Sequence, residues 1–191
     1  MPALAEAAIG KVRSKMRIGR RRFLVLSLGA AAFGKAHASE SLWAALRSGE
    51  AIAVLRHAAA PGSVDPPDFR LGDCSTQRNL SEEGRAQSRA IGDLFRANGI
   101  SSAIVYSSQW CRCLDTARLL GIGEVVPLDL LNSFFGDSSA AEERTAALLA
   151  WLREQRFGEP AVLVTHQVNI TGLTGEVPDS GEMIIVRIPY S

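Results

Sequence analysis

Five short apolar runs divide the chain and predict the strands of a sheet, at residues 51–55, 103–106, 125–126, 161–164 and 183–188. The runs at 51–55 and 161–164 are apolar at every position. Continuous apolar runs of this length are typical of strands that are covered on both faces. We therefore expect the centre of the sheet to be buried between layers of helices.

Amphipathic segments separate these runs and predict helices at 42–47, 82–97, 112–120 and 140–156. Ser81 is the expected N-cap of the second helix, and Asn98-Gly99 ends it. The apolar face of the last helix is expected to include Ala147, Leu148, Trp151 and Leu152. Alternating strands and helices predict an α/β fold of three layers, with helices on both faces of a mostly parallel sheet.

The first 38 residues differ in composition from the rest of the 191-residue chain. They carry a net charge of +7, whereas the remainder carries −6. The run Arg20-Arg21-Arg22-Phe23-Leu24 fits the twin-arginine pattern, and an apolar stretch and the small-x-small site Ala36-His37-Ala38 follow it. This order predicts an export signal over 1–38 and a periplasmic or otherwise exported domain over 39–191. An uncleaved anchor and a basic amphipathic helix of the mature protein are the alternatives.

The acidic balance of residues 39–191 argues against nucleic acid as a partner, because nucleic-acid binding relies on a basic face. No apolar run approaches the roughly 20 residues that span a bilayer, so we expect no stable membrane span after signal cleavage. Export would place Cys74, Cys111 and Cys113 in an oxidising compartment. We expect Cys74 to pair with one of the other two, and three buried thiols are the alternative. A zinc site is disfavoured because Cys-x-Cys lacks a second close ligand pair.

Histidines and arginines follow the ends of three predicted strands. His57 follows the first strand, with Arg56 before it, and His166 follows the strand at 161–164. Arg112 stands at a helix start after the strand at 103–106, and a helix start favours anions. Neighbouring parallel strands end at one edge of a sheet, so these side chains can converge if their strands are neighbours. The natural occupant of such a cluster is an anionic group, most simply phosphate.

Four segments of the chain resemble the histidine phosphatase superfamily. Leu55-Arg56-His57-Ala58 resembles its Arg-His-Gly signature, and residues 79–87 (NLSEEGRAQ) resemble P-L-T-x-x-G-x-x-Q-A. Residues 106–117 (YSSQWCRCLDTA) are similar to S-S-x-x-x-R-x-x-x-T-A, and residues 162–166 (VLVTH) to V-x-V-S/T-H. Residues 73–80 and 165–172 are similar to the exported branch near lipopolysaccharide core heptose-phosphate phosphatase.

The resemblance implies a phosphoglycerate mutase-like fold and a phosphatase that needs no metal or other cofactor. It makes His57 the nucleophile, which becomes a transient phosphohistidine, and makes Arg56, Arg112 and His166 the ligands of the phosphoryl oxygens. The expected substrate is a phosphorylated small molecule or an envelope glycan. The alternatives are a non-catalytic protein that binds phosphate or sugar phosphate, and a phosphoglycerate mutase-like phosphotransferase.

The general acid departs from the family pattern. Many members carry Glu shortly before a Phe-Gly dipeptide, but here Asn132 stands at that position before Phe135-Gly136. Asn cannot donate a proton to a leaving alkoxide, so Asp137 is the expected substitute, with helix capping as its alternative role. Asp65 and Asp68 are weaker candidates for the acid. The two long loops, 58–80 and 132–139, should border a pocket without a lid that encloses little beyond the phosphoryl group.

Overall fold

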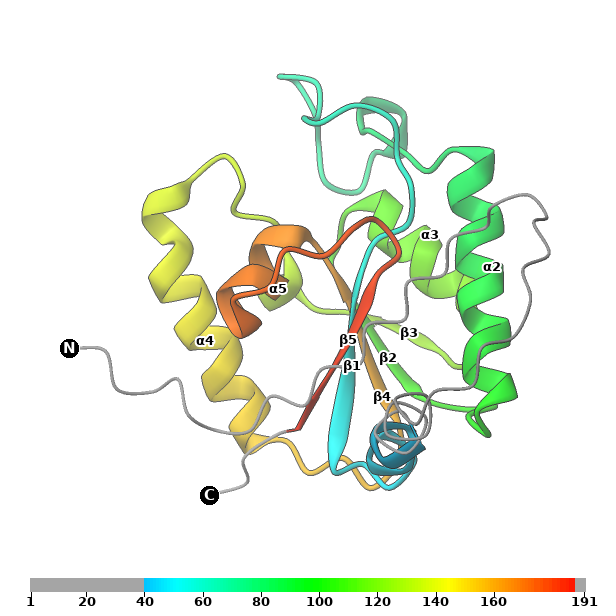
Figure 1. Ribbon diagram of the computed structural model, residues 1–191. Helices are drawn as coiled ribbons and strands as arrows, with labels where there is room; N and C mark the ends of the chain where they lie inside the picture. Colours follow the sequence, from blue (N-terminus) through cyan, green and yellow to red (C-terminus); the bar gives the residue numbers. More distant parts are fainter. Residues whose placement is uncertain (1–39, 188–191) are drawn as a thin grey trace, which may run out of the picture.

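The computed structural model describes residues 40–187, which form a five-stranded sheet between two layers of helices (Figure 1). The strands are β1 (Ala51–Arg56), β2 (Ile104–Ser107), β3 (Val125–Pro127), β4 (Ala161–Thr165) and β5 (Met183–Arg187). Their order across the sheet is β3-β2-β4-β1-β5, and only the pairing of β5 with β1 is antiparallel within this sheet. The predicted α/β architecture with a mostly parallel sheet is confirmed.

Helices cover both faces of the sheet, as predicted. The helix at 40–47 packs with α2 (Glu82–Ala97) and α3 (Cys111–Leu120) on one face, and α4 (Ala141–Glu154) packs with α5 (Gln167–Thr174) on the other (Figure 1). Three short 3-10 turns complete the elements: η1 (Cys74–Thr76), η2 (Asp129–Leu131) and η3 (Ser138–Ala140). Each face of the sheet therefore has its own apolar core.

Local signals set the ends of α2 and α3 where the sequence predicted them. The Ser81 hydroxyl accepts a hydrogen bond from the Gly84 N–H at 3.1 Å, and Asn98 is the C-cap of the same helix. The α3 helix ends at Gly121, whose φ of 61° lies in the left-handed region that glycine adopts without strain.

The structure corrects two details of the predicted helices. Residues 167–174 form α5, which was not predicted, because their β-branched residues are weak helix formers. Burial of Ile170 against the sheet stabilises this helix. The apolar face of α4 is also narrower than expected: Leu148 and Leu152 are buried, but Ala147 is exposed.

Strand register places the two histidines side by side. Arg56 of β1 lies opposite Thr165 of β4, so the next residue of each strand, His57 and His166, leaves the sheet at the same edge. The β2 strand pairs with the other side of β4 and leads to α3 at this edge.

The predicted export signal, residues 1–38, lies outside the described residues. Between residues 40 and 187 no helix has the length and apolar character needed to cross a bilayer.

Candidate functional site

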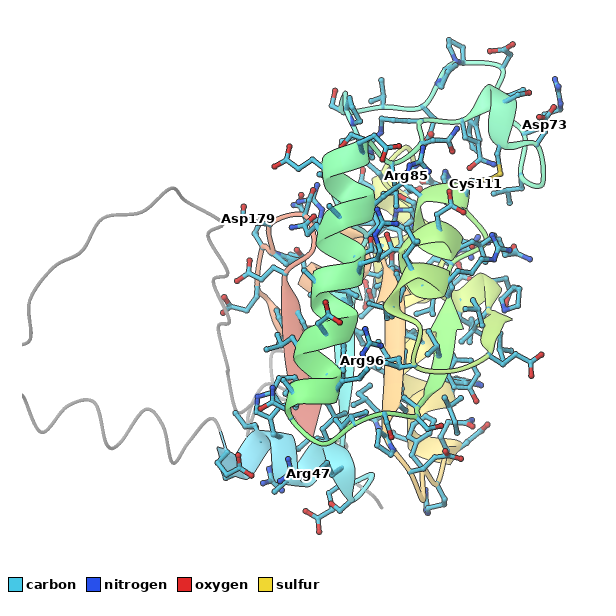
Figure 2. The ribbon with its side chains drawn as sticks, turned by 90° about the vertical axis from the view of Figure 1, so that its right-hand side faces the viewer. Arg47, Asp73, Arg85, Arg96, Cys111 and Asp179 are labelled. Carbon is cyan, nitrogen blue, oxygen red and sulfur yellow. A yellow bond between two sulfur atoms is a disulfide. The ribbon has the colours of Figure 1, made fainter. Side chains whose placement is uncertain are left out.

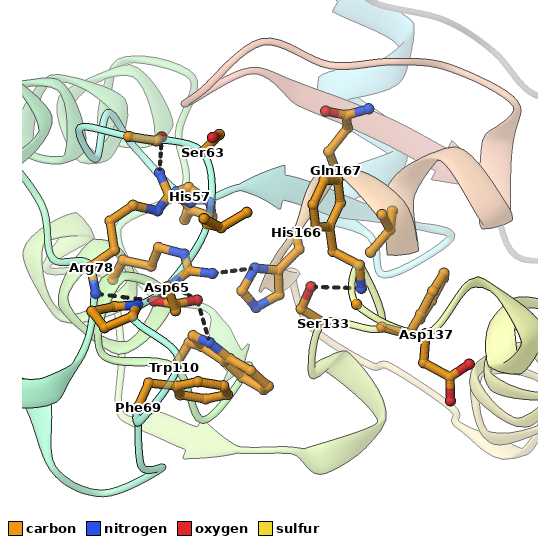
Figure 3. A pocket seen from close by; sticks show the side chains of 18 of the residues that line it. His57, Ser63, Asp65, Phe69, Arg78, Trp110, Ser133, Asp137, His166 and Gln167 are labelled. Atoms are coloured by element: carbon orange, nitrogen blue, oxygen red, sulfur yellow. Dashed lines mark hydrogen bonds and ion pairs between the residues drawn. The ribbon is translucent and has the colours of Figure 1, made fainter.

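A cavity of about 690 Å³ opens beyond the carboxyl ends of β1 and β4 (Figure 3). Its floor contains the four residues that were predicted to converge: Arg56, His57, Arg112 and His166. Loop 58–80 and loop 132–139 form its walls, as expected. The cavity is larger than a phosphoryl group and has a volume typical of small-molecule sites, and the open pocket without a lid stays a prediction.

His57 is held as a neutral imidazole with one nitrogen free for attack. Its Nδ1 lies 2.9 Å from the carbonyl oxygen of Ala58, which can only accept a hydrogen bond. The proton therefore resides on Nδ1, and Nε2 keeps its lone pair. Burial lowers the pKa of His57 to about 3, and the positive charges of Arg112, Arg56 and Arg78 act in the same direction. A neutral imidazole of this tautomer is the form that a phosphoryl acceptor requires.

His166 lies beside His57, with ring centroids 5.5 Å apart, and is oriented by a chain of hydrogen bonds. Its Nε2 lies 2.9 Å from the Ser108 hydroxyl, which in turn donates to the Asn132 Oδ1 at 3.2 Å. Its Nδ1 faces the Arg112 Nη2 at 3.5 Å. Burial and the nearby positive charge of Arg112 lower the pKa of His166 well below its usual value. Both imidazoles are therefore neutral in the empty cavity.

Asn132 belongs to this supporting chain and does not line the cavity. Its amide donates to Gln109 Oε1 at 2.8 Å, and its side-chain oxygen accepts from the Gln109 N–H and the Ser108 hydroxyl. The residue is nearly buried behind His166. The position at which the family often has its acid is thus used here to orient a histidine.

Three arginines in the cavity wall present buried N–H groups that have no partner. They are the Nε atoms of Arg56, Arg78 and Arg112. The remaining contacts hold the guanidinium groups in place: Arg56 donates to the Pro178 carbonyl at 2.8 Å, and Arg78 donates to the Ala60 and Gly62 carbonyls. The three guanidinium groups give the cavity wall a fixed positive charge, which favours an anion.

Residues from the other segments that resemble the histidine phosphatase superfamily bind the backbone directly after His57. Thr116 Oγ1 accepts from the Ala58 N–H at 3.0 Å, and Gln87 Oε1 accepts from the Ala59 N–H at 3.0 Å. A Cβ at Gly84 would overlap the carbonyl oxygen of Ala59, so glycine is needed for this close approach of α2. These three residues fix the segment that directly follows His57.

Asp65 is the acidic side chain that the structure brings against the predicted phosphate ligands. Its carboxylate accepts from Arg112 Nη1 at 2.9 and 3.1 Å, from Trp110 Nε1 at 3.1 Å and from the Arg78 N–H at 3.0 Å. Burial opposes ionisation, but the hydrogen bonds from the Arg78 backbone, Arg112 and Trp110 outweigh it and lower the pKa of Asp65. Asp65 is therefore a carboxylate.

Asp137 does not have the environment of a general acid. It lies at the rim of the cavity with an exposed side chain, which accepts from the N–H and hydroxyl of Ser139 (Figure 3). These hydrogen bonds lower the pKa of Asp137. The contacts are those of an N-cap of η3, the alternative role that the sequence left open.

The disulfide joins Cys74 to Cys111, one of the two pairings expected, and Cys113 is a buried free thiol. It links loop 58–80 to the start of α3, next to Arg112 (Figure 2). The first N–H of α3, at Cys111, is taken by Gln77 Oε1 at 2.9 Å, so the helix start offers an anion less than we expected. Burial raises the pKa of Cys113 to about 12, so it stays a thiol.

Sequence reasoning did not single out Arg78 and named Asp65 only as a weaker candidate for the acid. Both lie on the long loop, where no periodicity indicates which side chains face inward. The hydrogen bond from the Ser81 N–H to the Ala59 carbonyl returns the end of the loop to the segment after His57, and no local sequence pattern marks this contact. Arg70 and Asp68 of the same loop lie outside the cavity lining, and Arg70 pairs with Asp73 at 2.7 Å.

Residues 40–187 contain no group of three or more His, Cys, Asp or Glu side chains placed to hold a metal ion.

Comparisons with known proteins agree with the architecture of this site. Residues 52–134 match the family model of the histidine phosphatase superfamily (branch 1). This match supports a histidine-based phosphatase and confirms the resemblance seen in the sequence, although it does not test the exported branch. A search of curated protein sequences gave no match.

Solved structures with this fold include the product of open reading frame Rv3214 from Mycobacterium tuberculosis, with a TM-score of 0.54 and 19% identity over 71% of this chain and 90% of that one. A phosphoserine phosphatase variant from Entamoeba histolytica, in complex with phosphoserine, has a TM-score of 0.52 and 17% identity over 71% and 89% of the two chains. A mycobacterial glucosyl-3-phosphoglycerate phosphatase has a TM-score of 0.47 and 20% identity over 66% and 79%. At these identities the likeness concerns the fold alone.

Proposed function

Residues 52–134 belong to the histidine phosphatase superfamily, and on that premise we propose that the chain is an exported phosphomonoesterase that acts through a phosphohistidine at His57. One observation carries the proposal. A neutral imidazole with a free Nε2 shares a cavity with the guanidinium groups of three arginines, Arg56, Arg78 and Arg112. The first is a nucleophile and the second is a built receptor for phosphoryl oxygens.

The reaction proceeds in two displacements. His57 Nε2 attacks phosphorus, the P–N bond forms, and the ester P–O bond breaks as the alcohol leaves with a proton. Water then attacks the phosphorus, the P–N bond breaks, and inorganic phosphate leaves. The fixed positive charges of Arg56 and Arg112 stabilise the charge on the equatorial oxygens in both steps, where each donor contributes on the order of 10²–10³ in rate.

His166 contributes to the same receptor after it gains a proton. In the empty cavity its Nδ1 faces the Arg112 guanidinium, and its Nε2 is engaged by Ser108. A bound phosphoryl group adds negative charge beside the ring and favours the imidazolium, whose Nδ1–H can then donate to a phosphoryl oxygen.

The lining of the cavity supports a substrate with an organic part larger than the phosphoryl group. Four aromatic side chains line the cavity, those of Phe69, Trp110, Phe134 and Phe135. Aromatic faces of this kind pack against sugar rings, and we therefore favour envelope sugar phosphates as substrates. The twin-arginine segment and the Cys74–Cys111 disulfide support export, because disulfides persist in oxidising compartments.

The test is to trap the intermediate on purified residues 39–191. The wild-type protein should release phosphate from several phosphomonoesters, should be insensitive to EDTA, and should carry an acid-labile phosphoryl group on His57 after rapid quenching. His57→Ala should lose at least about 10³-fold in turnover, and Arg112→Ala about 10²–10³-fold. A melting curve like that of wild type shows that each variant is folded.

The competing outcome is a protein that binds phosphate without catalysis. Such a protein would bind a sugar phosphate but would release no phosphate and would never be phosphorylated. A phosphotransferase would instead move the label from His57 to an added acceptor in preference to water. Turnover of His57→Ala within tenfold of wild type would reject the nucleophile.

A further inference from the structure

Asp65 lines the same cavity as His57 and forms an ion pair with Arg112, one of the predicted phosphate ligands. Its side chain is 12% exposed and lines the cavity, and its partner Arg112 is 5% exposed. Donors from three parts of the molecule surround the carboxylate: Arg112 on α3, Trp110 just before it, and the backbone of Arg78 on the long loop. In Figure 3 the carboxylate lies between Arg78 and Trp110 and faces the same space as His57 and His166.

The other carboxyl groups near the site are less suited to proton donation. Two carboxylates line the cavity among the described residues, those of Asp65 and Asp137. Asp137 is exposed and held by Ser139. Asn132 has an amide in place of a carboxyl group, and this amide takes part in the chain of hydrogen bonds behind His166. Of the two carboxylates that line the cavity among the described residues, Asp65 is therefore the one that contacts a predicted phosphate ligand, Arg112.

We propose that Asp65 is the general acid and base of this site, and that it alternates between pairing with Arg112 and holding a proton. The proposal rests on the phosphohistidine mechanism given above. In the empty cavity Asp65 compensates the charge of Arg112, as observed. When a phosphoryl group binds the free N–H groups of the arginines, its negative charge takes over that compensation. A negative charge this close raises the pKa of a carboxyl group by about 1–3 units, so Asp65 then accepts a proton.

The protons balance over the cycle: His166 takes its proton from solvent on binding and returns it when phosphate leaves, and Asp65 handles the protons of the reaction itself. The ester enters as its monoanion, whose last proton has a pKa of about 6 and passes to Asp65 as the dianion settles against the arginines. Asp65 gives this proton to the leaving oxygen as the P–O bond breaks and the bond from phosphorus to His57 Nε2 forms. Asp65 then takes a proton from the attacking water as the P–N bond breaks. Inorganic phosphate leaves with that proton, and Asp65 pairs with Arg112 again.

Two leaving groups separate this role from simple positioning of Arg112. The substrates are 4-nitrophenyl phosphate, whose phenolate leaves without a proton, and glycerol 1-phosphate, whose alkoxide needs one. With Asp65→Asn, kcat/KM for glycerol 1-phosphate should fall at least about 100-fold, and kcat/KM for the aryl ester less than about tenfold. The variant should also release about one equivalent of nitrophenolate in a burst and accumulate phosphohistidine, because water attack has lost its base.

Asp68→Asn is the matched control, since Asp68 is exposed on the same loop and lies outside the cavity lining. It should leave both activities unchanged. Equal losses on the two esters without accumulation of phosphohistidine would overturn the proposal and make Asp65 a positioning residue for Arg112. A selective loss on glycerol 1-phosphate with Asp137→Asn would transfer the role to Asp137.

Two further measurements keep the result decisive. If Asp65→Asn does not fold, wild-type kcat/KM across a series of aryl and alkyl phosphates takes its place, because it reports the first chemical step. A steep fall with increasing leaving-group pKa would show that no acid acts in that step. Failure of the proposed function looks different, since wild type would then carry no phosphohistidine with either ester.

Discussion

The two loops that wall the cavity are built in opposite ways. Loop 58–80 is anchored to α3 by the Cys74–Cys111 disulfide, and Asp65 and Arg78 on it bond to residues far away in the sequence or across the loop. Loop 132–139 continues from the buried Asn132 to an exposed tip. There Phe135 is 64% exposed, and Asp137 bonds to its neighbour Ser139.

The difference separates two tasks of the site. Charged groups that must meet a phosphoryl group with precision lie on the floor or on the anchored wall. The tip of the other wall offers apolar contacts with little to fix them, so it can adapt to the organic part of a substrate. We therefore expect changes in the anchored wall to affect stability and turnover, and changes in the other wall to affect affinity.

Among the changes that test the difference between the two loops, removal of the disulfide should have the largest effect. The bridge closes a loop across a sequence separation of 37 residues. In the chain-entropy model such a loop stabilises a protein by about 3–4 kcal/mol. Cys74→Ser combined with Cys111→Ser should lower the free energy of unfolding by this amount in urea titrations, and turnover should also fall because Asp65 and Arg78 lose their anchor.

Reductant gives the control for this prediction. Dithiothreitol should destabilise the wild type toward the level of the double variant and should leave the double variant unchanged. Full turnover in a reduced, folded protein would show that the bridge does not position the anchored wall.

Lowering the pH tests the two histidines on the floor of the cavity, between the two loops. The pKa of His57 is about 3 in the folded protein and 6.5 as the ordinary value, so the unfolded chain binds more protons between these pH values. Stability therefore falls as the pH drops from 7 to 5, by about 2 kcal/mol for His57. His166, whose pKa is also lowered, acts in the same direction.

Urea titrations of wild type and His57→Asn at pH 7 and pH 5 measure this effect. The variant should lose about 2 kcal/mol less than wild type over the same interval. Equal losses in both proteins would mean that folding does not lower the pKa of His57, contrary to the buried neutral imidazole described above.

The smallest effect should come from the exposed wall. Phe135→Ala removes an aromatic contact and should raise KM for a sugar phosphate about 3- to 10-fold, with kcat within twofold. Val126→Ala is the control, because Val126 is 42% exposed on β3 and lies outside the cavity lining. A tenfold drop in kcat with Phe135→Ala would show that this wall also positions the reacting groups.

Much of the fold followed from short-range signals. The apolar runs of β1 and β4, the cap at Ser81 and the stop at Gly121 each act within a few residues, so the sequence alone locates them. The α5 helix was missed for the complementary reason. Its local preference is weak, and burial of Ile170 and hydrogen bonds from Asn169 to the segment at 130–132 stabilise it.

The sequence by itself determined which groups could do the chemistry. They are two histidines at the ends of strands, together with two arginines that can reach the same edge of the sheet. The rule that parallel strands end at one edge was enough to predict their convergence. Only the tertiary structure decided which carboxylate joins them. Asp65 meets Arg112 across 47 residues of sequence because a long loop folds back and a disulfide holds it there. No local pattern encodes such a contact, since it depends on where two distant segments are packed.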